Sequence, residues 1–261
     1  MGDFLLSIED LGVSYPGKVG FFSNERIPVL KGISLSVKKG ETLGIVGESG
    51  SGKTTLGRSI VRLASIDTGR ISFEHCCISE LSENAFLPYR RKIQMIFQDP
   101  FDSLNPKMTI EQILEEPLAI HFPQLSIFER RRRMMKLLDR VKLPKMYLKR
   151  YPNALSGGQR QRIGIARALA VEPEILICDE PVSALDVSIQ AAILNLLKDL
   201  QTEMGLTYLF ISHDMAIVRY ISNEVAVMQN GRIIECGPVE SIYKNPQNAY
   251  TKQLLAAVPK L

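Results

Sequence analysis

The octapeptide GESGSGKT at residues 47–54 matches the pattern G-x-x-x-x-G-K-[ST]. We call this segment the phosphate loop. Its glycines let backbone N–H groups close around phosphate oxygens, while Lys53 can reach the β- and γ-phosphates and the Thr54 hydroxyl can bind Mg²⁺. A glycine-rich turn without a ligand is the alternative. The flanking patterns disfavour it, because residues 42–47 resemble a buried strand and residues 54–63 a helix. The sequence therefore predicts a nucleoside triphosphate site.

Two acidic residues, Asp179 and Glu180, end the apolar run ILICDE. Asp179 can hold magnesium through water and Glu180 can act on the attacking water, which is the division of labour that hydrolysis needs. Two acids that merely begin a solvated loop are the alternative, and the phosphate loop upstream makes the functional interpretation stronger. GTPases, kinases, helicases and many ATPases share this pair of motifs, so the pair predicts the ligand and not the biological task.

A second possible anion site lies at LSGGQ, residues 155–159, directly before a helical pattern. The first N–H groups of a helix lack partners inside the helix, and the helix dipole adds positive charge there. Ser156, Gly157 and Gly158 offer a hydroxyl and close backbone approach. A purely structural helix cap is the alternative.

Alternating strand and helix patterns must position these residues. Residues 33–37, 174–180 and 207–212 predict strands, and Ile193, Leu196, Leu197 and Leu200 mark one face of a long helix. From about residue 109 the pattern is helical, with a capping box at residues 126–129 and apolar positions at Met134, Leu137, Leu138 and Val141. Asn230-Gly231 predicts a hairpin turn, and residues 16–27 a surface loop. An α/β fold with a helical subdomain follows.

The composition suits a globular protein and sets few limits on ligands. The 261 residues are 45% hydrophobic with a net charge of +4, which permits anionic ligands or a lipid surface without requiring them. We expect no nucleic acid partner, because an extended basic surface or stacking motifs are not evident. The run Arg130 to Arg133 predicts a solvated helix face, with lipid contact as the alternative.

The four cysteines, Cys76, Cys77, Cys178 and Cys236, show neither zinc-site spacing nor a disulfide framework, which fits a reducing compartment. Cys178 is interpreted as a small buried residue of its strand. The first residues lack the pattern of a signal peptide, and no apolar run approaches the ~18 residues of a membrane span. We therefore expect a soluble chain.

Taken in order, the motifs resemble the ATP-binding cassette (ABC) ATPases over nearly the whole chain. Beyond the motifs above, the chain has Tyr15 before the phosphate loop, Gln98 in IFQDP, SALD at residues 183–186 and His213 in ISHD. The resemblance implies ATP and Mg²⁺ as cofactors, with Glu180, His213 and Gln98 as catalytic residues and Thr54, Gln98 and Asp179 at the metal. It implies nucleotide contacts from Tyr15, Gly47, Glu48, Ser49, Gly50, Ser51, Gly52, Lys53, Thr54 and Thr55, and contacts to a second subunit's ATP from Ser156, Gly157, Gly158 and Gln159.

The implied fold is a P-loop NTPase core of ABC type with a mixed sheet, an N-terminal antiparallel β subdomain and an inserted helical subdomain. We expect one domain over residues 1–261, with the helical subdomain at about 100–160 and a C-terminal tail at about 238–261.

Residues 96–110, 209–222 and 245–261 resemble the ATPase subunits of bacterial oligopeptide, dipeptide and nickel importers. This branch implies an ATPase for peptide or nickel import, bound peripherally to the cytoplasmic face of the inner membrane. Its implied partners are two permease subunits, a second ABC ATPase that is identical or related, and indirectly an extracytoplasmic substrate-binding protein. The segment 97–105 and the helices after it would form the face that docks on the permeases.

A soluble ABC ATPase that acts on ribosomes or DNA is the alternative function. An exporter ATPase is disfavoured by the absence of fused membrane segments and by the importer-like tail. Some members of the importer branch hold an iron–sulfur cluster with C-terminal cysteines, but past residue 200 the chain has only Cys236, so we expect no cluster.

Overall fold

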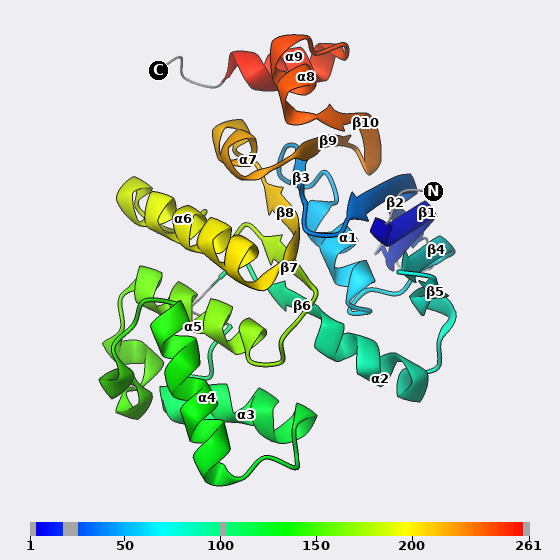
Figure 1. The fold of residues 1–261 in the computed structure, drawn as a ribbon. Coiled ribbons are helices and arrows are strands. Elements are labelled where there is room, and N and C mark those ends of the chain that lie inside the picture. Colours follow the sequence, from blue (N-terminus) through cyan, green and yellow to red (C-terminus); the bar gives the residue numbers. More distant parts are fainter. Residues whose placement is uncertain (1–3, 18–25, 100–102, 258–261) are drawn as a thin grey trace. The chain divides into compact units, whose positions relative to one another are not determined.

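The computed structural model describes residues 4–17, 26–99 and 103–257, and the chain divides into two compact units. The first unit comprises Met1–Tyr89 and Thr207–Leu261, and the second comprises Arg90–Leu206. The boundary at Tyr89 falls inside helix α2 (Glu83–Lys92). Figure 1 shows the elements in sequence colours, and each unit is described separately below.

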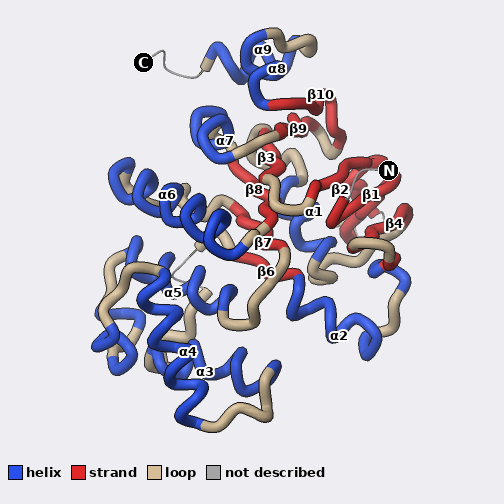
Figure 2. Tube along the Cα trace, in the orientation of Figure 1, coloured by secondary structure: helices blue, strands red, loops and turns tan. Residues whose placement is uncertain are grey.

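An antiparallel sheet with the strand order β2-β1-β4-β5 opens the first unit. Its strands are β1 (Phe4–Pro16), β2 (Arg26–Lys38), β4 (Thr68–Phe73) and β5 (Cys76–Cys77), followed by the short helix η1 (Ile78–Glu80). Figure 2 shows β1, β2 and β4 grouped together. The N-terminal antiparallel subdomain is thus confirmed.

The predicted loop over residues 16–27 is wrong at both ends. Ser14, Tyr15 and Pro16 pair with Pro28, Ile27 and Arg26, so the β1–β2 ladder extends farther than the turn-rich composition indicated. Arg26 holds the extension in place, because its guanidinium bonds Ser14 and forms a 2.7 Å ion pair with Asp67. The middle of the predicted loop, residues 18–25, lies outside the described residues.

A mixed sheet forms the other part of the first unit. Strand β3 (Thr42–Val46) runs parallel to β8 (Thr207–Ser212) and β9 (Glu224–Gln229), and β9 pairs antiparallel with β10 (Arg232–Pro238). Every residue of β3 and β8 is buried, as expected for parallel strands covered on both faces. The helices of this unit are α1 (Lys53–Ile60), α7 (Met215–Ile221), α8 (Val239–Lys244) and α9 (Ala249–Ala256). The α/β class with a mixed sheet is therefore confirmed.

The β9–β10 turn has the backbone that its sequence predicts. Asn230 and Gly231 have φ angles of 49° and 79°, the left-handed conformations that a tight hairpin turn requires. The predicted hairpin is confirmed.

The second unit combines two parallel strands with helices. Strand β6 (Ile93–Ile96) pairs with β7 (Ile175–Asp179), whose residues are all buried. The helices are α3 (Ile110–His121), α4 (Ile127–Arg140), α5 (Gly157–Leu169) and α6 (Val187–Met204), with the short helices η2 (Lys145–Lys149) and η3 (Pro152–Ala154). In Figure 1, α3, α4 and α5 lie close together, and both α3 and α5 contact α4.

The helix patterns of the second unit are borne out. Ser126 and Glu129 form the predicted capping box of α4, and Met134, Leu137 and Leu138 are its buried face. Helix α6 buries the predicted apolar positions Ile193, Leu196, Leu197 and Leu200. The spacing of apolar residues was enough to predict these buried faces, because each helix buries a single stripe of apolar side chains.

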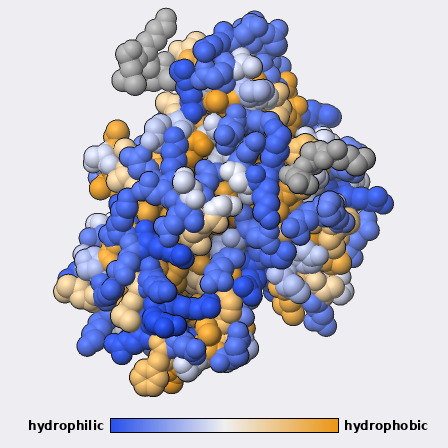
Figure 3. Space-filling model, viewed as in Figure 1, coloured by the Kyte–Doolittle hydropathy of each residue, from blue (hydrophilic) through white to orange (hydrophobic). Residues whose placement is uncertain are grey.

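Hydrophilic residues predominate on the face drawn in Figure 3, and apolar residues are scattered across it. Ile127 and Phe128, in the first turn of α4, are 73% and 86% exposed. Within the described part of the chain, no helix combines the length and the apolar character needed to cross a membrane.

Candidate active site

The phosphate loop connects β3 to α1 in the first unit, as the sequence predicted. Gly50 and Gly52 have φ angles of 79° and 106°, which only glycine adopts without strain. Glu48, Ser49 and Gly50 are exposed, whereas Thr54 and Thr55 are half-buried in the first turn of α1. The loop leads into the start of α1, and the first N–H groups of a helix lack partners inside the helix, so this is a suitable place for an anion.

Lys53 lies inside the loop that precedes it. Its side chain is only 5% exposed, and its ammonium donates hydrogen bonds of 2.7 Å to the Gly47 carbonyl and 2.8 Å to the Glu48 carbonyl. These contacts hold a positive charge at the centre of the loop. An anion bound there would meet Lys53 without a large rearrangement of the chain.

The β9–β10 hairpin contacts the phosphate loop through its backbone. The Gly231 N–H donates to the Ser51 carbonyl over 3.0 Å. A Cβ atom at Gly47 would lie 2.1 Å from the Met228 carbonyl oxygen, so only glycine fits at the first position of the loop. Gly47 is therefore needed for packing against Met228 as well as for close contact between the loop backbone and a phosphate.

His213 follows β8 at the same sheet edge as the phosphate loop. Val46 and Ser212 are register partners in the parallel β3–β8 pair, so Gly47 and His213 are the next residues of neighbouring strands. His213 is exposed, and Asp214 caps α7 by accepting hydrogen bonds from the Ala216 and Ile217 N–H groups. The structure thus brings His213 to the edge that carries the phosphate loop.

Tyr15 lies elsewhere in the first unit, on β1 opposite Ile27. Its side chain is 38% exposed, so its ring offers a face for stacking. A role in adenine binding stays a prediction.

In the second unit, β7 delivers Asp179 and Glu180 together. Asp179 is 2% exposed, and Glu180 has a left-handed φ of 45° that turns the chain directly after the strand. The Glu180 carbonyl accepts hydrogen bonds from the N–H and the hydroxyl of Ser183, which begins SALD. This turn separates the two carboxylates, so one is buried at the strand end and the other is half-buried.

Gln98 and Glu180 meet at this sheet edge. Ile96 and Cys178 are register partners in the parallel β6–β7 pair, and each of the two site residues follows two positions later. The Gln98 amide donates a 3.1 Å hydrogen bond to Oε2 of Glu180. Cys178, as predicted, is fully buried, and this burial raises the pKa of its thiol.

Ser156 begins α5 through a capping box. Its hydroxyl accepts a hydrogen bond from the Gln159 N–H, and the Gln159 side chain accepts one from the Ser156 N–H. The S-x-x-Q spacing is the sequence signature of this capping box, whereas the prediction named only an anion site or a structural helix cap.

Packing also explains the second glycine of LSGGQ. A Cβ atom at Gly158 would lie 2.5 Å from Cγ2 of Ile189 on α6, whereas one at Gly157 would lie 3.2 Å from a Leu185 methyl. Close approach of α5 to α6 therefore requires a very small residue at 158. Ser156 itself is exposed and accessible to a partner.

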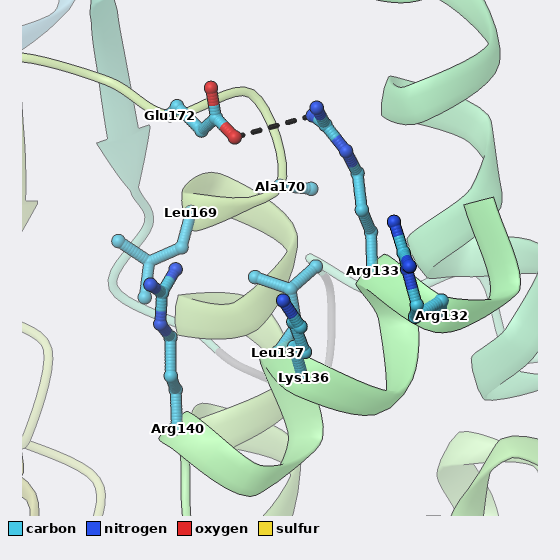
Figure 4. A pocket seen from close by; sticks show the side chains of 8 residues that line it. All are labelled: Arg132, Arg133, Lys136, Leu137, Arg140, Leu169, Ala170 and Glu172. Carbon is cyan, nitrogen blue, oxygen red and sulfur yellow. Dashed lines mark hydrogen bonds and ion pairs between the residues drawn. The ribbon is translucent and has the colours of Figure 1, made fainter. Parts of the chain in front are cut away.

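The run Arg130 to Arg133 lies on α4. A pocket of about 250 Å³ lies beside α4. Figure 4 shows the side chains that line it: Arg132, Arg133, Lys136, Leu137, Arg140, Leu169, Ala170 and Glu172. Arg133 pairs with Glu172 at 3.2 Å, while Arg130 and Arg131 face Glu115 and Glu111. Ion pairs of this kind are typical of a solvated helix face.

Comparison with known proteins decides the family. The ABC transporter profile matches residues 30–183 of the chain. The chain belongs to the ABC transporter family. The predicted resemblance and the class of ATP-hydrolysing transporter subunit are thereby confirmed.

Two relatives illustrate the similarity in sequence. The oligopeptide transport ATP-binding protein OppF of Bacillus subtilis is 53% identical over 87% of this chain and 75% of the relative. OppF of Lactococcus lactis is 45% identical over 98% of this chain and 81% of the relative.

Two solved structures confirm the ABC-type fold. The cassette cbiO1 from Clostridium perfringens, part of the transporter complex cbiONQ, has a TM-score of 0.79 and 30% identity, covering 93% of this chain and 92% of that one. The ATP-binding cassette MJ0796, in a dimer bound to ADP and Pi, has a TM-score of 0.79 and 32% identity, covering 90% and 98%.

Proposed function

We propose that this ABC ATPase hydrolyses ATP to power the import of peptides across a membrane. The observation that carries the proposal is the 53% identity to an oligopeptide transport ATP-binding protein over 87% of the chain. The sequence suggested peptides or nickel as the cargo. Peptides are favoured because OppF and a second Bacillus subtilis relative, AppF, are both named oligopeptide transport ATP-binding proteins. The alternative of an ATPase for ribosomes or DNA gains no support.

Each site residue has a distinct part in the proposed chemistry. The phosphate-loop amides and Lys53 bind the triphosphate, and His213 contacts the γ-phosphate. Glu180 orients and polarises the attacking water, while Gln98 holds the Glu180 carboxylate in place through its 3.1 Å hydrogen bond. Tyr15 stacks on the adenine.

Magnesium suits the donor set that the motifs provide. Within the described residues no cluster of three acidic, cysteine or histidine side chains could hold a metal by itself. Mg²⁺ typically keeps several waters and binds through one or two protein oxygens plus substrate phosphates, so a single buried carboxylate and a hydroxyl are appropriate. Asp179, Thr54 and Gln98 would hold the ion, which neutralises developing charge on the phosphates.

A second cassette and two permeases complete the assembly. Ser156, Gly157, Gly158 and Gln159 would contact the ATP held by the phosphate loop of a second ABC ATPase. MJ0796, a neighbour in fold, is described as a dimer. An extracytoplasmic binding protein would deliver the peptide, and the ATPase would sit on the cytoplasmic face of the membrane.

The surface proposed for permease docking is the segment 97–105 with the helices after it. Residues 100–102 lie outside the described residues. At its described end, the Ser103 carbonyl accepts a 2.6 Å hydrogen bond from Arg167 on α5, the helix that begins at the LSGGQ motif. Contact of this kind could couple a bound permease to the helix that contacts ATP.

Affinity purification of the tagged subunit from gently solubilised membranes tests the proposal. We expect peptide-transporter permeases and a second ABC ATPase among the bound proteins, and peptide uptake that is lost when Lys53→Ala replaces the parent subunit. Recovery of ribosomal proteins or nucleic acid in place of permeases would contradict it. Import of nickel without import of peptides would overturn the choice of cargo.

A further inference from the structure

The C-terminal helix α9 contacts the phosphate loop. Tyr250, in the first turn of α9, is 7% exposed, and its hydroxyl accepts a 3.0 Å hydrogen bond from the Glu48 N–H. The two residues are 202 positions apart in the sequence and belong to the same unit. A residue outside every nucleotide-binding motif thus bonds the backbone of the loop.

The bonded N–H belongs to the peptide group that also holds Lys53. The Gly47 carbonyl and the Glu48 N–H are two ends of one planar peptide group, and the carbonyl accepts the 2.7 Å bond from the Lys53 ammonium. Fixing the N–H therefore fixes the direction of the carbonyl. Hydrogen bonds at both ends of a peptide group also polarise and strengthen each other.

Tyr250 is itself held by the structure around it. The Asn248 side chain caps α9 and accepts a 2.8 Å hydrogen bond from the Tyr250 N–H. The Glu235 carboxylate, on β10, accepts hydrogen bonds from the Gln247 and Asn248 N–H groups at 2.7 Å and 3.1 Å. The phenol thus approaches the loop from an anchored helix start.

We propose that Tyr250 is a positioning residue for nucleotide binding, which orients the Gly47–Glu48 peptide and, through it, the Lys53 ammonium. The C-terminal segment is then part of the ATP site and not only an appendage to the cassette. This inference rests on ATP binding by the phosphate loop.

Tyr250→Phe removes the hydroxyl and keeps the ring, so the fold should persist. Loss of one hydrogen bond to a loop that must be ordered for binding should weaken ATP binding roughly three- to tenfold. KM for ATP should rise more than kcat falls, because the reacting carboxylate is untouched. Equilibrium binding of ATP and steady-state hydrolysis measure both effects.

Tyr243→Phe is a matched control. Tyr243, on α8 in the same C-terminal segment, donates its hydroxyl to the carbonyl of Met215, a residue outside the phosphate loop. Its variant loses a comparable phenol–backbone bond, so it should lower the melting temperature similarly and keep the parent affinity for ATP.

A double variant tests the route through Lys53. If Tyr250 acts by orienting the Lys53 ammonium, Tyr250→Phe should have almost no further effect on ATP affinity in a Lys53→Ala background. Equal ATP affinity in Tyr250→Phe and the parent, or an equal loss in Tyr243→Phe, would overturn the inference. A parent protein that binds no ATP would instead refute the proposed function.

Discussion

Nε2 of Gln98 lies 3.1 Å from Oε2 of Glu180, in a hydrogen bond that joins the loops after the parallel strands β6 and β7. The bond fixes the orientation of the Glu180 carboxylate, the group proposed to act on water. It also ties the proposed base to the segment that would face the permeases, so the site and the docking surface share a residue.

Glu180→Gln should nearly abolish hydrolysis and preserve ATP binding. A positioned general base typically contributes about 10²–10⁴-fold to the rate, and the amide keeps the shape of the carboxylate. Phosphate release and ATP affinity are the measurements. Glu174→Gln is the control, because Glu174 precedes β7 at its opposite end and pairs with Lys92 at 2.8 Å. Turnover by Glu180→Gln at close to the parent rate would remove Glu180 from its proposed role.

Gly158→Ala should destabilise the protein, whereas Gly164→Ala in the same helix should not. A Cβ atom at 158 would lie 2.5 Å from Ile189, and overpacking of this kind costs about 1–3 kcal/mol. Among the described residues, no atom outside the neighbouring backbone of α5 lies within 4 Å of a Cβ built at Gly164, where alanine favours the helix by about 0.5–1 kcal/mol. Urea unfolding measures both changes. Equal stability of the two variants would show that Ile189 moves aside without cost.

Much of the site could be predicted because its parts are local. The buried strand of residues 42–46, the glycine-rich turn and the helix after it are contiguous, so apolar runs and glycine positions were sufficient. The same holds for Asp179 at the end of β7. In each case the functional residues lie at or directly after the end of a strand that is buried on both faces.

Contacts between distant segments could not be predicted in this way. Periodicity shows which face of a helix is buried but not which residue packs against it, so neither the Tyr250–Glu48 bond nor the Gly158–Ile189 contact was evident. The end of the β1–β2 ladder was likewise predicted as a loop over residues 16–27, because the segment is rich in turn-forming residues and tertiary pairing prevailed over them.

His121 should make stability depend on pH. Burial, and secondly the charge of Arg91, lower the pKa of His121 below its ordinary value of 6.5. The unfolded chain therefore binds the proton more readily, and stability is fully present above about pH 6.5 and falls as the pH decreases through the folded-state pKa.

Denaturant unfolding at about pH 7.5 and about pH 5.5 measures this effect. His121→Gln should reduce the loss of stability between the two pH values, whereas His75→Gln, at an exposed turn residue, should leave it unchanged. The same pH dependence in the parent and in His121→Gln would assign the effect to other groups.

The last prediction is that active sites are shared between two cassettes. Lys53→Ala removes the ammonium inside the phosphate loop, and Ser156→Arg places a bulky cation at the exposed start of α5, so each variant alone should have little activity. In a dimer that contains one chain of each kind, one site carries both changes and the other carries neither. Mixing the variants should therefore restore up to about half of the parent activity per mixed dimer, by the additive behaviour of independent sites.

Ser126→Arg is the control for the cap itself. Ser126 begins α4 with the same capping box that Ser156 forms at α5, and both serines are exposed. Loss of a cap costs roughly 1 kcal/mol of stability in either helix, but only position 156 is proposed to face a partner's ATP. Ser126→Arg should therefore stay active without complementation. If proven mixed dimers of Lys53→Ala and Ser156→Arg hydrolyse no more ATP than the separate variants, each site must be complete within one chain, and α5 needs another role.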